Sequence, residues 1–393
     1  MNSKTAFNIR KKIIKTAHGE IQTPFFMPDA TRGYVKGLSR ADLEMAGVGP
    51  MVVNTFHLYL QPGISKLKIK NEKLKMKGGI HSFMNWPHPL LSDSGGFQVF
   101  SLIRNATLKG GRREEMGKIF DDKVVFKSPL DGSFHELTPE KSIQIQFDLG
   151  VDMMVCLDDC PPNDYAKNEL ENSVKRTISW AKRCRKEYEK QVKKRKLKDV
   201  SKPLLFSVIQ GGAEKSLRKY CADELIKIGF DGYGFGARPV DAEGNRMEDI
   251  LAYTANLIPE DSLRFALGVG TPDDIIKCVS YGWDMFDCVI PTREARHGKL
   301  FQSLKFKVNL PAQAGSLKLN EKFYNSININ NSKFVKDFSP INEESKLQEL
   351  QEYKKAYLRH LFKMKELLGA RLATLNNLEF YMGLMKGIRN FKF

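Results

Sequence analysis

The stretch LLSDSGGFQVF, residues 90–100, joins a short apolar run to an acid, a serine and two glycines. We interpret its leucines as a buried strand, after which Gly95 and Gly96 let the chain turn sharply and let another molecule approach the backbone. Seven other apolar runs also stop at polar residues or glycine: 24–33, 51–58, 153–159, 204–212, 232–239, 264–272 and 285–293. Apolar runs without alternation are typical of strands buried on both faces of a parallel sheet.

Helical patterns separate most of these runs. In the segment 138–150, Thr138 is a suitable N-cap and Pro139 suits the first helical position, and the segments 39–49 and 272–282 are similar. Eight strand–helix units predict an α/β protein with a (β/α)8 TIM barrel. The alternative is an open doubly wound sheet, which the absence of a GxGxxG fingerprint disfavours.

The polar residues that end these strands form the candidate site, because barrel active sites lie at the carboxyl ends of the strands. Five polar side chains are expected there: Asp93, Asp158, Asp159, Gln210 and Asp287. Several carboxylates at one mouth suit cleavage of a glycosidic bond, since one can attack the anomeric carbon while another moves the leaving group's proton. An amide such as Gln210 could read a base edge. The alternative for any single acid is a cap on the following helix.

Two segments depart from a bare barrel. Residues 123–137 contain two strand-like runs around Asp131-Gly132, which predicts an inserted β-hairpin. Residues 303–346 are polar and weakly patterned, and a helical pattern resumes at Leu347. We therefore expect residues 1–302 to form the catalytic barrel, and residues 303–393 to form a C-terminal subdomain that is irregular at first and then helical.

The composition favours a polyanionic partner. The chain carries 63 Lys+Arg against 46 Asp+Glu, a net charge of +17, which suits nucleic acid, although a solvated basic surface has the same signature. The basic run 189–202 is more typical of a solvated face. The six cysteines form no CxxC pair, the start lacks a signal-peptide core, and no long apolar run suggests a membrane span. We expect a cytoplasmic protein with reduced thiols and no membrane partner.

Four motifs resemble one enzyme family. The stretches 93–102 (DSGGFQVFSL), 208–212 (VIQGG), 267–274 (LGVGTPDD) and 286–298 (FDCVIPTREARHG) closely resemble the tRNA-guanine transglycosylases, also called queuine or pre-queuosine tRNA-ribosyltransferases. The resemblance extends from Thr5 to Gly387 and is weakest across 303–344. It implies a pentosyltransferase of queuosine biosynthesis or salvage, which replaces guanine at the tRNA wobble position with the pre-queuosine base or queuine. The implied partners are the anticodon loop of tRNA, free guanine and a free 7-deazaguanine base, together with a homodimer contact; no cofactor is implied.

The resemblance also implies roles for individual residues. By motif position, Asp287 is the nucleophile that forms a covalent link to the ribose, and Asp93 is the general acid/base for the leaving and incoming bases. The implied base pocket consists of Ser94, Gly95, Gly96, Phe97, Asp158, Gln210, Gly236 and Ala237. The implied RNA contacts are Gly268, Val269, Gly270, Thr271, Pro272, Asp273, Asp274, Thr292, Arg293, Glu294, Ala295 and Arg296.

The sequence departs from the family pattern at the zinc site. Bacterial members carry three cysteines and a histidine that bind a structural zinc, and the helical stretch 351–381 sets the register for comparison. The four ligand positions fall on Ser345, Leu347, Leu350 and Asn376. Leucine cannot replace a thiolate, and His360 alone makes no site, so we expect no metal.

A second departure concerns the loop that holds the base's 7-substituent in the family. Where members read GGLA, this chain reads Gly236, Ala237, Arg238 and Pro239. Arg238 adds a cation, and Pro239 removes a backbone donor. The choice of incoming base is therefore left open between the pre-queuosine base, queuine and another 7-deazaguanine.

Three alternatives to an active tRNA enzyme are a non-catalytic RNA-binding subunit, a related exchange on DNA, and a sugar hydrolase. Retention of both Asp93 and Asp287 argues against the subunit, which needs neither acid. The TREARHG stretch, residues 292–298, favours tRNA over DNA by family analogy. The basic charge and the Gln/Asp pair argue against the hydrolase.

Overall fold

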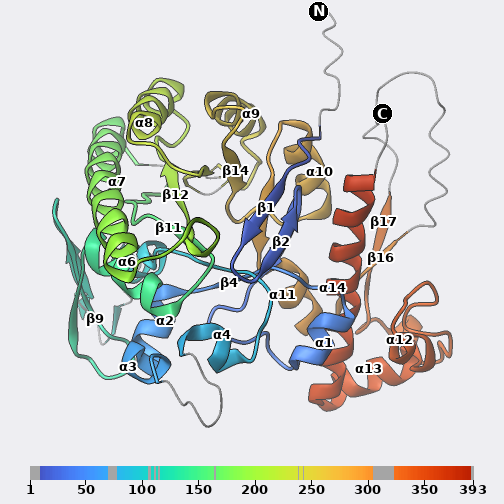
Figure 1. Cartoon of the computed structure of the whole chain (residues 1–393). Helices are drawn as coiled ribbons and strands as arrows, with labels where there is room; N and C mark the ends of the chain where they lie inside the picture. Colours follow the sequence, from blue (N-terminus) through green and yellow to red (C-terminus); the bar gives the residue numbers. More distant parts are fainter. Residues whose placement is uncertain are drawn as a thin grey trace, which may run out of the picture.

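The computed structural model describes residues 9–69, 78–104, 108–109, 112–113, 116–162, 165–237, 239–241, 243–303 and 323–390. Its centre is a parallel sheet (Figure 1) with the strands β3 (Phe25–Pro28), β4 (Met51–Val53), β5 (Leu90–Ser92), β11 (Met153–Val155), β12 (Leu204–Ile209), β13 (Gly232–Phe235), β14 (Leu263–Ala266) and β15 (Met285–Cys288). Each pairs with the next, β15 returns to β3, and a bridge between Asp29 and Val52 joins β3 to β4. The eight predicted strands are all present, and the predicted (β/α)8 fold class is confirmed.

Helices surround this sheet (Figure 1). They are α1 (Arg40–Met45), α2 (Thr55–Leu58), η1 (Tyr59–Gly63), α3 (Ile64–Leu67), α4 (Gly79–Met84), α5 (Gly96–Arg104), α6 (Pro139–Leu149), α7 (Lys167–Arg195), η2 (Asp199–Ser201), α8 (Lys215–Ile228), α9 (Glu248–Leu257), α10 (Pro272–Ser280) and α11 (Ile290–Arg296). The predicted caps are present, because Thr138 accepts a hydrogen bond from the Lys141 N–H at the start of α6 and Pro139 is the first helical residue.

Alternating side chains separate the inside of the barrel from its outside. On β3, Phe25 and Met27 pack into the inner cluster, whereas Phe26 packs outward under the helices. On β13 a Cβ at Gly232 would lie only 2.4 Å from the ring of Phe206. Glycine there leaves room for the large aromatic side chain from the neighbouring strand.

A hairpin closes the amino-terminal end of the barrel. Strands β1 (Ile13–Thr16) and β2 (Gly19–Gln22) pair antiparallel. Their buried side chains Ile14 and Ile21 join the inner cluster of the barrel. The strands finish at the opposite end, which forms the mouth.

The inserted hairpin lies between β5 and β11 as predicted. Strands β9 (Val124–Lys127) and β10 (Phe134–Leu137) pair antiparallel and join β8 (Gly117–Ile119) in a small sheet. Gly132 takes a φ of 75° in the turn, a conformation that favours glycine. A further short pair, β6 (Leu108–Lys109) with β7 (Arg112–Arg113), precedes this sheet.

The carboxyl-terminal region packs on one side of the barrel (Figure 1). It contains β16 (Lys299–Ser303), β17 (Tyr324–Asn328), η3 (Ser332–Phe334), α12 (Gln348–Glu352), α13 (Lys355–Met364) and α14 (Leu367–Asn390). The side chain of Asn377 on α14 donates to the carbonyls of Pro291 and Lys299, and Tyr381 donates to the carbonyl of Gly270 at 2.6 Å. Residues 304–322 of the predicted irregular segment lie outside the described residues.

None of the helices in the described part of the chain combines the length and the apolar composition needed to cross a membrane. The longest, α7, spans 29 residues but is rich in lysine and arginine.

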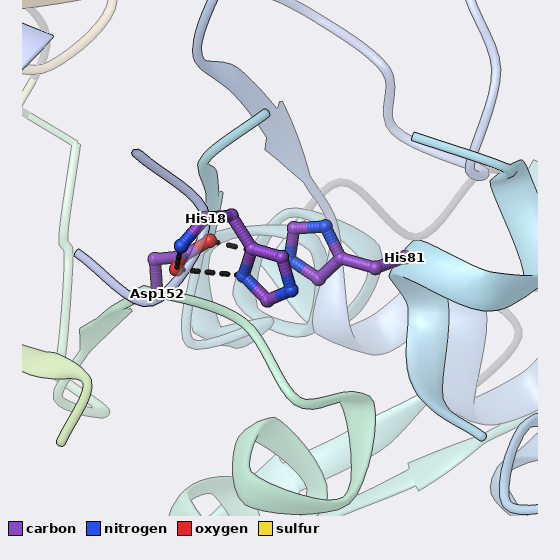
Figure 2. Close-up of side chains that lie close together, drawn as sticks. All are labelled: His18, His81 and Asp152. Atoms are coloured by element: carbon purple, nitrogen blue, oxygen red, sulfur yellow. Dashed lines mark hydrogen bonds and ion pairs between the residues drawn. The ribbon is translucent and has the colours of Figure 1, made fainter. Parts of the chain in front are cut away.

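A buried aspartate fastens three segments together at the closed end of the barrel (Figure 2). Asp152, just before β11, accepts hydrogen bonds from the backbone N–H and Nδ1 of His18 and from the backbone N–H of Leu90. It also forms an ion pair with His81 on α4 at 3.2 Å. The two imidazoles stack at 3.5 Å between ring centres with 12° between their planes. The possible ligand atoms of His18, His81 and Asp152 all lie within 4.8 Å of one another; in the structure Nδ1 of His18 hydrogen-bonds to Asp152 and Nδ1 of His81 hydrogen-bonds to the carbonyl of Trp86.

We predict that Asp152→Asn lowers the free energy of unfolding by about 3 kcal/mol, the lower range for breaking a buried charged pair. Burial alone would raise the pKa of Asp152, but the hydrogen bonds and charges of His18 and His81 outweigh it and hold the pKa well below its ordinary value. This contribution is therefore present above about pH 4 and is lost as the pH falls further.

Denaturant melts between pH 3 and pH 8 measure this effect. The matched control is Asp148→Asn, which removes only partly exposed pairs with Lys68 and Arg195 and should cost at most about 1 kcal/mol. Equal losses in the two variants would remove Asp152 from its role as a fastening residue.

Candidate functional site

Asp93 is held at the mouth by donors from the neighbouring strand. It directly follows β5, and its Oδ1 accepts hydrogen bonds from the backbone N–H groups of Thr55 at 3.0 Å and Gly95 at 3.1 Å. Its Oδ2 accepts from Nδ2 of Asn54 at 2.5 Å. These donors come from the residues directly after β4 and β5, so the orientation of the carboxyl group is fixed before any substrate arrives.

Asp287 lies on β15, the last strand of the barrel. Its Oδ1 accepts one hydrogen bond, from the backbone N–H of Gly268 at 3.0 Å, and no second donor is recorded in the described part of the chain. Fewer donors than at Asp93 leave its other oxygen available to an incoming atom. A carboxylate in this state can act as a nucleophile.

The two carboxyl groups have raised and unequal pKa values. Burial raises the pKa of Asp93 to about 7, against the lowering effect of the Thr55 and Gly95 N–H groups, and the negative charges of Asp287 and Asp29 raise it further. Burial also raises the pKa of Asp287 to about 6, with the Gly268 N–H lowering it. Both carboxyl groups therefore titrate close to neutral pH, the range that suits groups that exchange protons or change charge during a reaction.

A buried amide and a carboxylate form the inner wall of the expected base pocket. Nε2 of Gln210, after β12, donates to Oδ2 of Asp158, after β11, at 2.7 Å. Oε1 of Gln210 is buried without a hydrogen-bond partner. A buried acceptor without a donor is unfavourable, so this atom suits a ligand that brings an N–H group. Asp159, expected at the same mouth, instead pairs with Arg176 of α7.

The glycine loop after β5 brings its backbone close to its neighbours. Gly95 has a φ of 78°, and a Cβ there would lie 3.0 Å from the backbone nitrogen of Phe56. At Gly96, the first residue of α5, a Cβ would lie 2.9 Å from Leu157. Ser94 is buried, whereas the ring of Phe97 is 47% exposed and available for contact with a ligand.

The loop after β13 supplies the other expected base-pocket residues. Ala237 has a φ of 81°, a conformation that an alanine rarely adopts. A Cβ at Gly236 would lie 2.5 Å from the amide carbon of Gln210, so the two residues are in direct contact. Arg238, which we expected to influence the choice of base, lies outside the described residues.

The expected RNA contacts divide into exposed and engaged side chains. Arg293 on α11 is 53% exposed at its side chain, whereas Thr292 and Ala295 on the same helix are buried. Asp273 accepts a hydrogen bond from Tyr324 at 2.8 Å, and Asp274 pairs with Arg246. The carboxylates of these two residues are therefore already engaged by other side chains of the protein.

The remaining predicted RNA contacts lie just before α10, at its first residue, or on α11. Thr271 caps α10, of which Pro272 is the first residue, and Gly270 packs so closely on Cys288 that a Cβ would lie 2.2 Å from it. Glu294 lies 3.5 Å from Lys299. Val269 is buried, and burial lowers the pKa of Arg296.

Sequence reasoning missed three residues of the mouth: Asp29, Asn54 and Thr55. Asn54 and Thr55 hold Asp93, and the negative charge of Asp29 raises the pKa of both Asp93 and Asp287. All three lie inside the predicted runs 24–33 and 51–58, just after the observed strands β3 and β4. The same rule that selected Asp93, a polar residue at a strand end, would have found them.

The residues at the positions that the resemblance assigned to zinc ligands have other partners. Oγ of Ser345 donates to Oε2 of Glu379 on α14 at 2.5 Å, and Nδ2 of Asn342 donates to Oδ1 of Asn376 at 3.0 Å. Leu350 is fully buried. These residues provide neither thiolate nor imidazole, so they do not fit the tetrahedral zinc site of the family.

Comparison with known proteins identifies the family. A family model described as queuine tRNA-ribosyltransferase matches residues 7–391. The queuine tRNA-ribosyltransferase of Halothermothrix orenii is 40% identical over 376 residues, which cover 96% of this chain and 88% of that protein. Those of a Psychrobacter species and of Thermodesulfovibrio yellowstonii are 40% and 39% identical, over 97% of this chain and 89% and 87% of their own lengths. The chain therefore belongs to the queuine tRNA-ribosyltransferase family of transferases.

Proposed function

We propose that this protein exchanges guanine at the wobble position of tRNA for a 7-deazaguanine base through a covalent link between Asp287 and the ribose. The observation that carries the proposal is the pair of carboxyl groups at one mouth with pKa values of about 7 and about 6, together with the Gln210–Asp158 pair and its unpartnered acceptor. The family relationship supplies tRNA and the queuosine pathway as the context.

The first half-reaction removes guanine. An oxygen of ionised Asp287 attacks C1′ of the ribose, and the bond between C1′ and the guanine nitrogen breaks. The bonding electrons go to the base, and protonated Asp93 transfers its proton to it, so that neutral guanine leaves. The product is an ester between Asp287 and the ribose, with Asp93 as a carboxylate.

The second half-reaction inserts the new base. The ionised Asp93 takes the ring N–H proton of the incoming 7-deazaguanine, and the freed nitrogen attacks C1′. The ester bond breaks and returns its electrons to Asp287. The side chains of Asp158 and Gln210 hold either base, with Oε1 of Gln210 accepting from an N–H of its edge. Every step uses this chain's own side chains and the two bases.

The anticodon loop is held by basic side chains beside the nucleophile. Arg293 and Arg296 lie on α11, the helix that follows Asp287 in the sequence, and the side chain of Arg293 is exposed. Guanidinium groups at this position suit phosphates or base edges of the RNA. The net charge of +17 adds a general attraction to a polyanion.

The decisive experiment incubates the purified protein with labelled guanine and tRNA that lacks queuosine. Incorporation of label supports exchange, since guanine-for-guanine exchange needs no knowledge of the natural incoming base. Binding of tRNA without incorporation would favour the non-catalytic subunit instead. Labelling of a matched DNA hairpin but not of tRNA would favour the DNA alternative.

We predict that Asp287→Asn abolishes exchange while tRNA binding stays nearly unchanged, because an amide is a far poorer nucleophile than a carboxylate. Denaturing gels should show a covalent RNA adduct with the parent protein and none with the variant. The control Asp148→Asn, on the outside of the barrel, should form adduct like the parent. An adduct of undiminished yield in Asp287→Asn would contradict the assignment.

We predict that Asp93→Asn slows exchange by at least about a hundredfold, the lower range for the loss of a general acid/base. In the parent, the rate of guanine release should fall below about pH 6, where Asp287 becomes protonated, and above about pH 7, where Asp93 loses the proton it donates. Single-turnover release across pH measures both limbs. The variant should lose the alkaline limb, and retention of that limb would place the proton donor elsewhere.

We also propose that the carboxyl-terminal subdomain, residues 303–393, is stabilised without zinc by the hydrogen bonds of Glu379. Its Oε1 accepts from the backbone N–H of Lys346 at 2.6 Å, and its Oε2 accepts from Ser345. This carboxylate thereby ties α14 to the loop that carries the former ligand positions.

We predict that a strong chelator leaves the thermal melt unchanged, whereas Glu379→Ala lowers the free energy of unfolding by about 1.5–3 kcal/mol, the range for hydrogen bonds to a charged group. The control Glu352→Ala removes only a bond with Gln348 at the surface. Elemental analysis completes the test. One tightly held zinc per chain, or a large drop in melting temperature with chelator, would show that other residues bind the metal.

A further inference from the structure

Arg218 is a fully buried cation in the first turn of α8. Its Nε donates to the carbonyl of Gly212 at 2.7 Å, Nη1 to the carbonyl of Ile209 at 3.2 Å, and Nη2 to the carbonyl of Gly236 at 3.0 Å. Its Cζ lies 4.1 Å from the ring centre of Phe235. One side chain thus joins the end of β12, the turn after it and the end of β13.

The charge of Arg218 is balanced without an acid. In the described residues, no carboxylate forms a recorded ion pair with it, and its hydrogen bonds go to three carbonyl oxygens. Burying a charge without a counter-ion is costly, and a leucine or methionine would avoid that cost but would leave the carbonyls of Gly212 and Gly236 without this donor. The guanidinium group is planar and directs N–H donors in three directions, whereas leucine and methionine have no side-chain donor.

The contacts of Arg218 lead directly to the base-reading amide. Gly236 is held from both sides, because its N–H donates to the carbonyl of Ile209 at 2.9 Å and its carbonyl accepts from Arg218. The amide of Gln210 lies against Gly236, with no space for a Cβ between them. Gln210 in turn donates to Asp158 and presents its unpartnered Oε1. A shift of Gly236 would therefore move the amide of Gln210 together with its unpartnered acceptor.

We propose that Arg218 is a positioning residue for base recognition, which fixes Gly236 and the turn at 209–212 so that Gln210 presents its amide to the purine-like base. The proposal rests on the proposed base exchange and adds a residue that touches neither base nor ribose. Recognition of the base then depends on the guanidinium group of Arg218. The chemistry depends on Asp93 and Asp287, which belong to other strands.

The test compares Arg218→Met and Arg218→Lys with the parent in labelled-guanine exchange into tRNA. Arg218→Met should raise KM for guanine by about tenfold or more, with kcat and KM for tRNA changed by less than about threefold. Arg218→Lys keeps the charge but not the fork, and should raise KM for guanine to an intermediate value. The matched control is Arg264→Met, which removes a buried arginine from β14 that donates to the carbonyl of Ile258.

A purely structural role predicts a different result. Arg218→Met and Arg264→Met would then lower the melting temperature alike and leave KM for guanine unchanged in the folded fraction, which would overturn the proposal. Isothermal titration calorimetry with guanine measures the binding affinity of each folded variant without requiring turnover. Weakened guanine binding in both Arg218 variants, with parent-like binding in Arg264→Met, supports the positioning role. A parent that binds guanine but exchanges none would instead refute the proposed function.

Discussion

The closure of the parallel sheet is the constraint on which the rest of the structure depends. The bridge between Asp29 and Val52 joins the first and second barrel strands, so all eight strands finish at one mouth. Residues from far-apart segments, such as Asp93 and Asp287, meet there only because the ring is closed. Asp29 takes part in this closing bridge, and its negative charge also raises the pKa of both Asp93 and Asp287. The residue that closes the barrel therefore also affects the charge state of the two candidate catalytic groups.

Two carboxyl groups in one mouth acquire different properties from their surroundings. Burial is the largest effect on both pKa values and raises each; the charges of Asp287 and Asp29 add to it at Asp93 and that of Asp29 at Asp287, while the backbone donors act in the opposite direction at both. Asp93 is held by three donors, whereas Asp287 has one and keeps an oxygen available. The same side-chain type can therefore serve as acid at one position and as nucleophile at the other.

The two ends of the barrel have different roles. At the closed end, Asp152 collects hydrogen bonds from the hairpin, from α4 and from β5, an arrangement that favours stability. After β12, Oε1 of Gln210 is buried without a donor, an arrangement that suits a ligand with an N–H group. Helix α14 supports the open end from outside, since Tyr381 donates to the carbonyl of Gly270 in the loop after β14 and Asn377 donates to the carbonyl of Pro291 in α11, after β15.

The sequence by itself was sufficient to predict the barrel, the inserted hairpin and the family, because continuous apolar runs, turn residues and strand-end motifs are local signals. Asp29, Asn54 and Thr55 carried the same local signal and were missed. Only the tertiary structure decided which polar groups meet. Asp159 pairs with Arg176 and Asp274 with Arg246, while Glu379 meets Ser345 from a distant helix. The fork of Arg218 likewise has no sequence signature, because its partners are backbone carbonyls on two strands that become neighbours only when the sheet forms.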